Sequence, residues 1–347
     1  MDELLEILLE HKRRYPQLTA VDLVKLVYQN HFGSGHFITD ESASLKRLEE
    51  EVSQLEPGEN KEMLFESIGN GLYRLNLRFL GSNLPLATVN RFFVLTAQEK
   101  RGDMDSFKTK LELVLQNHQD EDLESYLDTY EKAGYPAVHH SDAYKKYYAP
   151  SYRLVSSDFA LYFSVFKQIE TLFSAKQRIL VAVDGRSGAG KSHLSQLLHE
   201  VYDCPVISMD HFFLRPEQRS KKRMQEPGGN VDYERFKLEV TDKLRGNAPF
   251  RYQVYDCQTN TFSPSELIEP HKLIVVEGSY SHHPLLVDDY DLKIFLTVPA
   301  SVQERRILKR NGPVMLPRFK NEWIPLEELY FSALQIEEQS DLSLETQ

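Results

Sequence analysis

The segment from 185 to 192, Gly-Arg-Ser-Gly-Ala-Gly-Lys-Ser, holds the residues whose types and spacing are best suited to chemistry. It fits the pattern G-x-x-x-x-G-K-[ST]. Glycines let main-chain N–H groups turn inward around an anionic phosphate, which a Cβ would obstruct. In such a loop Lys191 reaches the β- and γ-phosphates, and the Ser192 hydroxyl binds Mg²⁺. The candidate nucleotide-binding residues are Gly185, Arg186, Ser187, Gly188, Ala189, Gly190, Lys191 and Ser192.

The residues on both sides of this loop predict the strand and the helix that such a loop requires. Residues 178–183 form a short apolar, β-branched run, and residues 192–199 have apolar side chains at helical spacing. A helix that begins at the loop adds partial positive charge where the phosphates would lie. The alternative is a chance glycine-rich turn.

Two acidic residues follow two further apolar segments. Residues 205–209 are expected to form a second buried strand that leads to Asp210, and residues 272–276 a third that leads to Glu277. In an open α/β sheet, ligands bind beyond the carboxyl ends of the strands. Asp210 is therefore placed to accept the proton of an attacking hydroxyl, and Glu277 to hold Mg²⁺ directly or through water. The alternative for Asp210 is an acidic cap at a strand–helix turn.

A basic helix is expected over residues 301–312, after a fourth apolar strand at 291–299. It carries Arg305, Arg306 and Lys309 in an otherwise acidic chain. Because this helix follows a strand that ends near the nucleotide, it is suited to close on the phosphates as a lid, where arginine stabilises the charge on a transferring phosphoryl group. The alternative is a solvated charged face.

Strands alternate with helical stretches from residue 178 onward, which favours an α/β fold with a doubly wound parallel sheet of the P-loop NTPase type. Residues 1–155 are predicted to form a mostly helical domain, with residues 66–78 left open between strand and loop. An apolar helix within 156–177 is expected to connect this domain to the second one at 178–334. Residues 335–347 are expected to form a polar tail that frays.

Four histidines of the first domain are the candidates for a second site: His31 and His36, which flank two glycines, and His139 and His140. Imidazoles suit zinc and other transition metals, but no tight metal-ligand spacing is present. The sequence does not show that the four residues meet. The alternative is that residues 139–153 form an aromatic-rich seam that packs the first domain, with hydrogen-bonded histidines inside it.

The composition limits the function classes. The 347 residues include 41% hydrophobic and 27% charged residues, as in an ordinary soluble protein of two domains. The net charge of −11 argues against nucleic acid as the main ligand. No apolar run approaches the ~18 residues of a membrane span, so no membrane association is expected. With no secretory signal, Cys204 and Cys257 are expected to be reduced thiols of a cytoplasmic enzyme, and a homo-oligomer is left open.

Over residues 178–312 these motifs together resemble the uridine kinase/phosphoribulokinase family of P-loop kinases. The resemblance rests on the glycine loop, on Ser-Met-Asp210-His-Phe-Phe, on Val-Val-Glu277-Gly-Ser-Tyr280, and on the basic helix. It implies ATP and Mg²⁺ as cofactors, Asp210 as the general base and Glu277 in support of magnesium. It also implies phosphate contacts from Arg306 and Lys309.

The same resemblance indicates an acceptor site. Residues 230–236 are similar to the segment that presents an aspartate to the sugar in nucleoside kinases, which makes Asp232 a candidate. Residues 252–256 are similar to the short strand that lines the acceptor site, so Tyr255 is a second candidate, and Tyr280 is a third. Residues 1–155 match no family that we can name.

The sequence therefore predicts a kinase that transfers the γ-phosphate of ATP to a hydroxyl of a small molecule, with a nucleoside such as uridine as the preferred acceptor. Lys191, Asp210 and Arg306 are the expected catalytic residues. The alternatives are a kinase of another sugar-like or amino-alcohol metabolite, an ATP-binding regulatory module that gates the first domain, and a first domain with a ligand or activity of its own. A GTPase is disfavoured, because the guanine-reading N-K-x-D motif does not occur.

Overall fold

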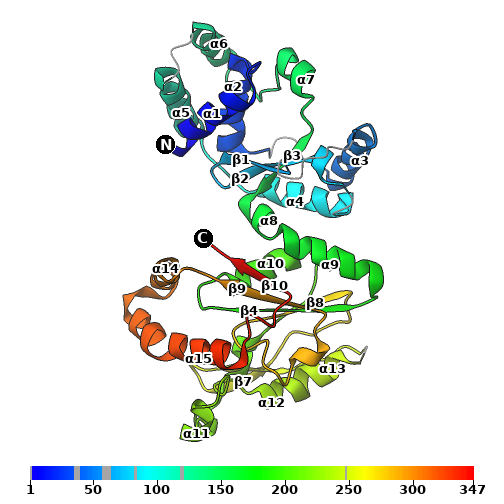
Figure 1. The fold of residues 1–347 in the computed structure, drawn as a ribbon, viewed down its shortest axis with the longest axis vertical. Helices are drawn as coiled ribbons and strands as arrows, with labels where there is room; N and C mark the ends of the chain where they lie inside the picture. The colour runs from blue at the N-terminus through cyan, green and yellow to red at the C-terminus, as the bar shows by residue number, and fades with distance from the viewer. Residues whose placement is uncertain (1, 35–39, 57–63, 82–83, 118–120, 247) are drawn as a thin grey trace. The chain divides into compact units, whose positions relative to one another are not determined.

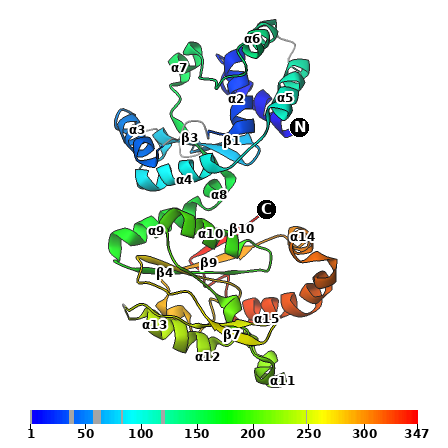
Figure 2. The same ribbon diagram turned by 180° about the vertical axis from the view of Figure 1, so that it is seen from behind.

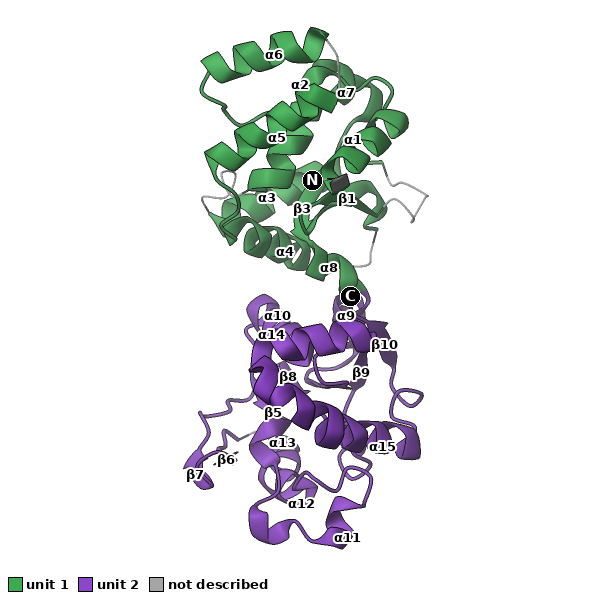
Figure 3. Ribbon diagram, turned by 90° about the vertical axis from the view of Figure 1, so that its left-hand side faces the viewer, with its two compact units in different colours: residues 1–163 green, residues 164–347 purple. Residues whose placement is uncertain are grey.

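The structure is a computed structural model, and it describes residues 2–34, 40–56, 64–81, 84–117, 121–246 and 248–347. The chain divides into two compact units, Met1–Phe163 and Ser164–Gln347 (Figure 3). Among the described residues, no helix is long and apolar enough to cross a membrane.

The first unit combines helices with a small antiparallel sheet in the order β1-β2-β3. Its apolar core gathers side chains from helices α1, α2, α5 and α6 and from the strands, because the apolar residues of these helices recur on one face. The prediction of a mostly helical domain is confirmed, and the segment left open between strand and loop forms β1 and β2. The elements are α1 (Asp2–Arg14), α2 (Ala20–Phe32), α3 (Glu41–Ser53), β1 (Phe65–Gly69), β2 (Leu72–Asn76), α4 (Leu86–Gln98), α5 (Met104–Asn117), α6 (Glu121–Lys132), α7 (Asp142–Tyr148), β3 (Tyr152–Ser156) and α8 (Ser157–Leu161) (Figure 1).

The second unit is built on a five-stranded parallel sheet in the order β10-β9-β4-β8-β5. This confirms the predicted α/β fold, with the strand of the glycine loop at its centre. The strands are β4 (Ile179–Gly185), β5 (Val206–Ser208), β8 (Leu273–Glu277), β9 (Leu292–Thr297) and β10 (Leu342–Glu345), and a separate hairpin pairs β6 (Gln253–Asp256) with β7 (Thr261–Pro264). The helices are α9 (Phe163–Ala175), α10 (Lys191–Tyr202), α11 (Lys221–Met224), α12 (Tyr233–Phe236), α13 (Asp242–Leu244), α14 (Ala300–Arg318) and α15 (Ile324–Leu334).

Helices cover both faces of the parallel sheet, which is why β4 and β8 are buried along their whole length. Figures 1 and 2 show α9 and α10 on one face and α12, α13 and α15 on the other. An apolar core fills the second of these faces, with Ile274, Val276 and Phe295 from the sheet packed near Phe236 and Phe331. The rigid sheet therefore fixes the loops that follow its strands.

Two predictions about the ends of the second domain are wrong in detail. The connector expected as one helix within 156–177 is two helices, α8 and α9, because the backbone leaves the helical region at Tyr162. The tail expected to fray over 335–347 contains β10, which pairs with β9 through Leu342 opposite Ile294. Alternate half-buried and exposed residues allow this edge strand to form through main-chain hydrogen bonds.

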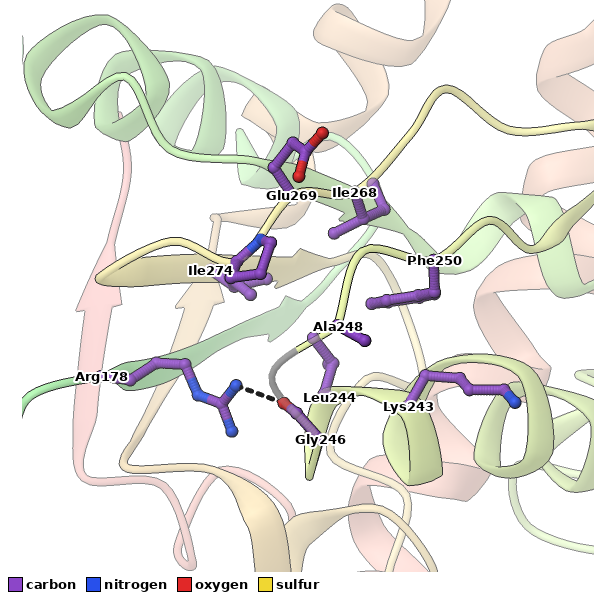
Figure 4. A pocket seen from close by; sticks show the side chains of 10 residues that line it. Arg178, Lys243, Leu244, Gly246, Ala248, Phe250, Ile268, Glu269 and Ile274 are labelled. Atoms are coloured by element: carbon purple, nitrogen blue, oxygen red, sulfur yellow. Dashed lines mark hydrogen bonds between the residues drawn. The ribbon is translucent and has the colours of Figure 1, made fainter.

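A small hollow lies at the amino ends of the strands, beside the start of β4 and β8 (Figure 4). Leu244, Phe250 and Ile268 give it an apolar lining, and Arg178 closes one side by donating to the Gly246 carbonyl at 2.7 Å. Since ligands of open α/β sheets bind at the carboxyl ends of the strands, this hollow lies at the wrong end for the predicted chemistry.

Candidate active site

The glycine loop joins the end of β4 to the start of α10. Gly185 has φ +135°, and a Cβ at this position would lie 2.0 Å from the Leu296 carbonyl oxygen of β9, so the close approach of the two strands requires glycine. Gly190 has φ 97° and caps the helix. The amides of the first helical turn have no acceptor within the helix, and they form a natural anion site.

Lys191 lies at the first position of α10 and folds back over the loop. Its Nζ donates to the Gly185 carbonyl at 2.6 Å and to the Arg186 carbonyl at 3.2 Å. These two contacts hold the ammonium against the carbonyl groups of the loop. Contact of Lys191 with phosphate oxygens stays a prediction.

Glu277 is the last residue of β8, at the carboxyl ends of the parallel strands. In the register it lies opposite Val183 of β4 on one side and Ser208 of β5 on the other. Its buried carboxylate accepts from Ser192 Oγ at 3.2 Å and from Ser208 Oγ at 2.8 Å. Burial raises the pKa of Glu277, and the nearby charge of Asp210 raises it further, while Ser208, Lys191 and Ser192 favour the ionised form.

Asp210 lies in a short 3-10 helix, Met209–Phe212, directly after β5. Its side chain is exposed, and its main-chain amide donates to Ser208 Oγ at 3.3 Å. Ser208 is therefore the cap, which argues against the alternative that Asp210 itself is the cap. The two acidic residues lie at the ends of strands that are neighbours in the sheet, since Ser208 of β5 pairs with Glu277 of β8.

His211 follows Asp210 and turns toward the β6 hairpin. Its Nδ1 lies 2.9 Å from the Tyr252 hydroxyl, and burial lowers the pKa of the imidazole. Arg235 donates to the His211 carbonyl at 2.6 Å and so ties α12 to the segment that carries Asp210.

The three acceptor-site candidates each have partners within the protein. Asp232 caps α12 by accepting from the Arg235 amide at 3.1 Å, and it also accepts from Gln218 at 2.8 Å. Tyr255 donates to Asn260 at 2.7 Å within the hairpin. Tyr280 is buried, and its ring packs 4.9 Å from that of Tyr330. Their contact with an acceptor stays a prediction.

The basic helix contacts the loop through Arg306. Its guanidinium donates to the Gly188 carbonyl at 2.9 Å and to Thr346 Oγ1 at 2.8 Å. Lys309 is exposed on the same helix. At Gly312, with φ 77°, the backbone leaves the helical region and divides α14. Phosphate contact by Arg306 or Lys309 stays a prediction.

Two carboxylates of the site were not predicted. Asp184, fully buried in β4, accepts from the His282 amide at 2.9 Å and from the Tyr330 hydroxyl at 3.0 Å. The sequence signal for Asp184 is an acidic residue inside an apolar strand, because a buried carboxylate needs hydrogen-bond donors around it. Glu327 of α15 accepts from the Ser187 amide at 3.0 Å and from Ser279 Oγ at 2.7 Å. No local pattern marks Glu327.

The side chain of Arg186 extends away from the loop toward β9 and α15. Its guanidinium pairs with Glu328 at 2.8 Å and donates to Thr297 at 2.7 Å. Burial opposes the charge, but the carboxylates of Glu328 and Glu337 raise the pKa of Arg186. The side chain of Arg186 therefore anchors the loop to β9 and α15.

Among the described histidines of the proposed second site, His31 and His140 have separate partners. His31 Nε2 lies 2.7 Å from the Asp103 carbonyl oxygen, whereas His140 Nδ1 lies 3.0 Å from Asp22. Asp22 and His31 are nine residues apart on α2, which is about 13 Å along a helix axis. His139 is exposed, and His36 lies outside the described residues.

In the described part of the chain, which does not include His36, no group of three or more His, Cys, Asp or Glu could hold a metal ion. The aromatic seam is present instead, since the His140 ring stacks on Tyr144 at 4.2 Å. His140 Nε2 also lies 2.7 Å from the Tyr152 hydroxyl. These contacts favour the packing interpretation of residues 139–153.

No protein-family model matches the chain, and no curated protein matches it in sequence. Among solved structures, it is similar to a protein described as a possible uridine kinase from Bacillus stearothermophilus, at 17% identity and a TM-score of 0.39 over 52% of this chain and 99% of that one. A second is a candidate fructose transport system kinase from a Silicibacter species, at 21% identity and a TM-score of 0.42 over 50% and 96%. A third is shikimate kinase from Bacteroides thetaiotaomicron, at 12% identity and a TM-score of 0.26 over 48% and 85%.

All three of these proteins are described as kinases. With such low identities and TM-scores, the likeness assigns no activity to this chain. The fold assignment stands on the strand order and on the strand–loop–helix geometry at residues 179–202.

Proposed function

We propose that this chain is an ATP- and Mg²⁺-dependent kinase that transfers the γ-phosphate of ATP to a hydroxyl group of a small molecule. The observation that carries the proposal is the position of Glu277. Its carboxylate bonds Ser192 at the start of α10 and Ser208 at the end of β5. One buried acid thus joins the phosphate loop to the segment that presents Asp210.

The residues present fit a magnesium ion. Mg²⁺ usually keeps several waters and is held by one or two carboxylates and by substrate phosphates. The Ser192 hydroxyl and the Glu277 carboxylate offer two hard oxygen ligands next to the loop that would hold those phosphates. Bound Mg²⁺ would neutralise the charge that develops on the transferring phosphoryl group.

The roles of the protein groups follow from their positions. Lys191, now on two loop carbonyls, would turn its ammonium to the β- and γ-phosphate oxygens. The exposed carboxylate of Asp210 would orient the acceptor hydroxyl and accept its proton. Catalysis would rest mainly on positioning and electrostatic stabilisation.

A nucleoside is the acceptor class that we propose. The support is the resemblance of residues 230–236 to the sugar-binding segment of nucleoside kinases, together with the bond from Arg235 to the His211 carbonyl. That bond ties α12, which Asp232 caps, to the segment that carries Asp210. Contacts of Asp232, Tyr255 and Tyr280 with the acceptor are part of the proposal. A sugar-like or amino-alcohol metabolite is the alternative acceptor.

The proposal is tested by incubating the full chain with ATP, Mg²⁺ and a panel of nucleosides, sugars and amino alcohols. Mass spectrometry would identify the phosphorylated product, and ADP release would give its rate. The expected result is ADP formation that depends on one acceptor class. Binding of ATP without stimulation by any acceptor would contradict the kinase assignment and favour the regulatory module.

A further inference from the structure

Three successive carbonyl groups of the phosphate loop each have a side-chain donor from the last part of the chain. Gln303 Nε2 donates to the Ser187 carbonyl at 2.9 Å, Arg306 to the Gly188 carbonyl at 2.9 Å, and Thr346 Oγ1 to the Ala189 carbonyl at 2.9 Å. We call Gln303, Arg306 and Thr346 the outer clamp. They come from α14 and from the segment after β10.

The three clamp residues are held in place themselves. Gln303 and Thr346 are buried, at 8% and 3% exposure. Gln303 and Arg306 are three residues apart and so lie on one face of α14. Thr346 is fixed by its main-chain amide, which donates to the Thr297 carbonyl of β9 at 2.9 Å, and its hydroxyl accepts from Arg306. The clamp is therefore connected to the rigid sheet.

The chemistry of the peptide bond links these outer contacts to the phosphate side of the loop. In a planar trans peptide, the C=O and the next N–H point in opposite directions. Donors on the carbonyls of Ser187, Gly188 and Ala189 therefore orient the amides of Gly188, Ala189 and Gly190 to the other side. The Ala189 amide closes a turn by donating to the Arg186 carbonyl at 3.0 Å. The Gly188 and Gly190 amides are thereby the two that the clamp leaves for an anion on the inner side of the loop.

Without these three donors, the peptide groups of the loop would reorient easily. Gly188 and Gly190 both have positive φ, at 76° and 97°, and glycine peptides reorient at little steric cost. A reoriented peptide would present a carbonyl oxygen to the phosphates, where it would repel them. Ile307 of α14 lies near Gly188 as well, with its Cγ1 3.6 Å from the position of an added Cβ.

We propose that Gln303, Arg306 and Thr346 are positioning residues that hold the phosphate loop in its nucleotide-binding conformation from outside. Arg306 then acts through the Gly188 peptide and not by contact with the transferring phosphate. This inference rests on the proposed function, because it concerns how the same loop binds a nucleotide. It assigns the strand β10 a function, since this strand delivers Thr346 to the loop.

The direct test is ADP affinity in the presence of Mg²⁺, measured by isothermal titration calorimetry on the full chain. Thr346→Val keeps the shape of the side chain and removes the donor, so a buried carbonyl loses its partner and ADP should bind about tenfold more weakly. Thr346→Ser keeps the hydroxyl and should restore affinity to within about twofold. Arg318→Ala, an exposed arginine that pairs with Glu322, is the matched control.

A second pair of variants keeps the proposal falsifiable if Thr346→Val folds poorly in the absence of nucleotide. Gln303→Met has similar volume and no donor, and it should also weaken ADP binding. Since Arg306 and Thr346 share a hydrogen bond, Arg306→Ala should cost less affinity in the Thr346→Val background than alone. If the losses of ADP affinity in the two single variants simply add in the double variant, Arg306 acts independently of Thr346. That result would overturn the shared clamp.

The outcomes separate this inference from the proposed function. If the wild-type chain binds no ADP, both fail. If it binds ADP and Thr346→Val and Gln303→Met bind it equally well, the clamp fails and the kinase proposal stands. If ADP binding responds as expected but no acceptor supports turnover, the clamp stands and the kinase proposal fails.

Discussion

Replacement of Gly185 by alanine tests whether the close approach of β4 and β9 sets the geometry of the phosphate loop. An added Cβ would lie 2.0 Å from the Leu296 carbonyl oxygen and 2.6 Å from its nitrogen, and φ +135° is itself unfavourable for alanine. Main-chain atoms of a central strand cannot move aside as a side chain can. Strain and overpacking together are expected to cost roughly 3–5 kcal/mol of the free energy of unfolding.

Gly312→Ala is the matched control, because Gly312 has φ +77° and no heavy atom within 4 Å of its added Cβ. With φ 77° and ψ 171° it should lose roughly 1–3 kcal/mol, the cost of a backbone conformation that is essentially restricted to glycine, with no steric clash added. Urea unfolding of both variants can be followed by the fluorescence of Trp323, the only tryptophan, which lies in the second unit. Equal losses in the two variants would refute the steric argument.

Two further predictions concern charge. Glu277→Gln should raise the Mg²⁺ concentration needed for half-maximal ADP binding about tenfold, because the proposed magnesium ligand loses its charge. Calorimetry without Mg²⁺ is the control, and an unchanged Mg²⁺ dependence would contradict the proposed metal site. Burial lowers the pKa of His140 to about 4, although the hydrogen bond to Asp22 works in the opposite direction and raises this pKa. The folded pKa lies below the unfolded value of about 6.5, so the unfolded state binds the proton first as pH falls. This contribution to the free energy of unfolding is therefore present above pH 6.5 and is lost toward pH 4, by about 2 kcal/mol between pH 7 and 5. His140→Gln should reduce that slope in urea unfolding of the first unit followed by circular dichroism, and an unchanged slope would refute it.

The phosphate loop and its sheet could be predicted from the sequence because the signals are local. The strand before Gly185, the helix after Lys191 and the acids at Asp210 and Glu277 all follow from short apolar runs and from the rule that parallel strands end at one edge. The contact between Glu277 and Ser192 is a direct consequence of that rule, since β4 and β8 are neighbours in the sheet.

The contacts that could not be predicted join residues far apart in the chain. Thr346 is 157 residues from Ala189, and Glu327 is 140 residues from Ser187. The strand β10 has only two half-buried leucines, so its polar sequence resembles a tail. Only the exposed edge of β9, which offers unpaired main-chain groups, shows why this segment becomes a strand.

The histidines of the first domain are candidates for a second site on residue type alone, without metal-ligand spacing. Among the described ones, His31 and His140 have different partners, the Asp103 carbonyl and Asp22, and their contacts lie at different positions along α2. Buried imidazoles satisfied by one carboxylate, one hydroxyl or one carbonyl are part of the packing of the first unit. Residue type without spacing is a weak indication of metal binding.

The proposed mechanism depends most on Asp210, which we expect to face the acceptor hydroxyl, with Glu277 between it and the phosphate loop. The most direct test is acceptor-dependent ADP release by Asp210→Asn, with the acceptor that the panel identifies. We expect kcat to fall by about 10²–10⁴ while ADP affinity stays within about twofold of the wild-type value. Full turnover in Asp210→Asn with the same acceptor would contradict it.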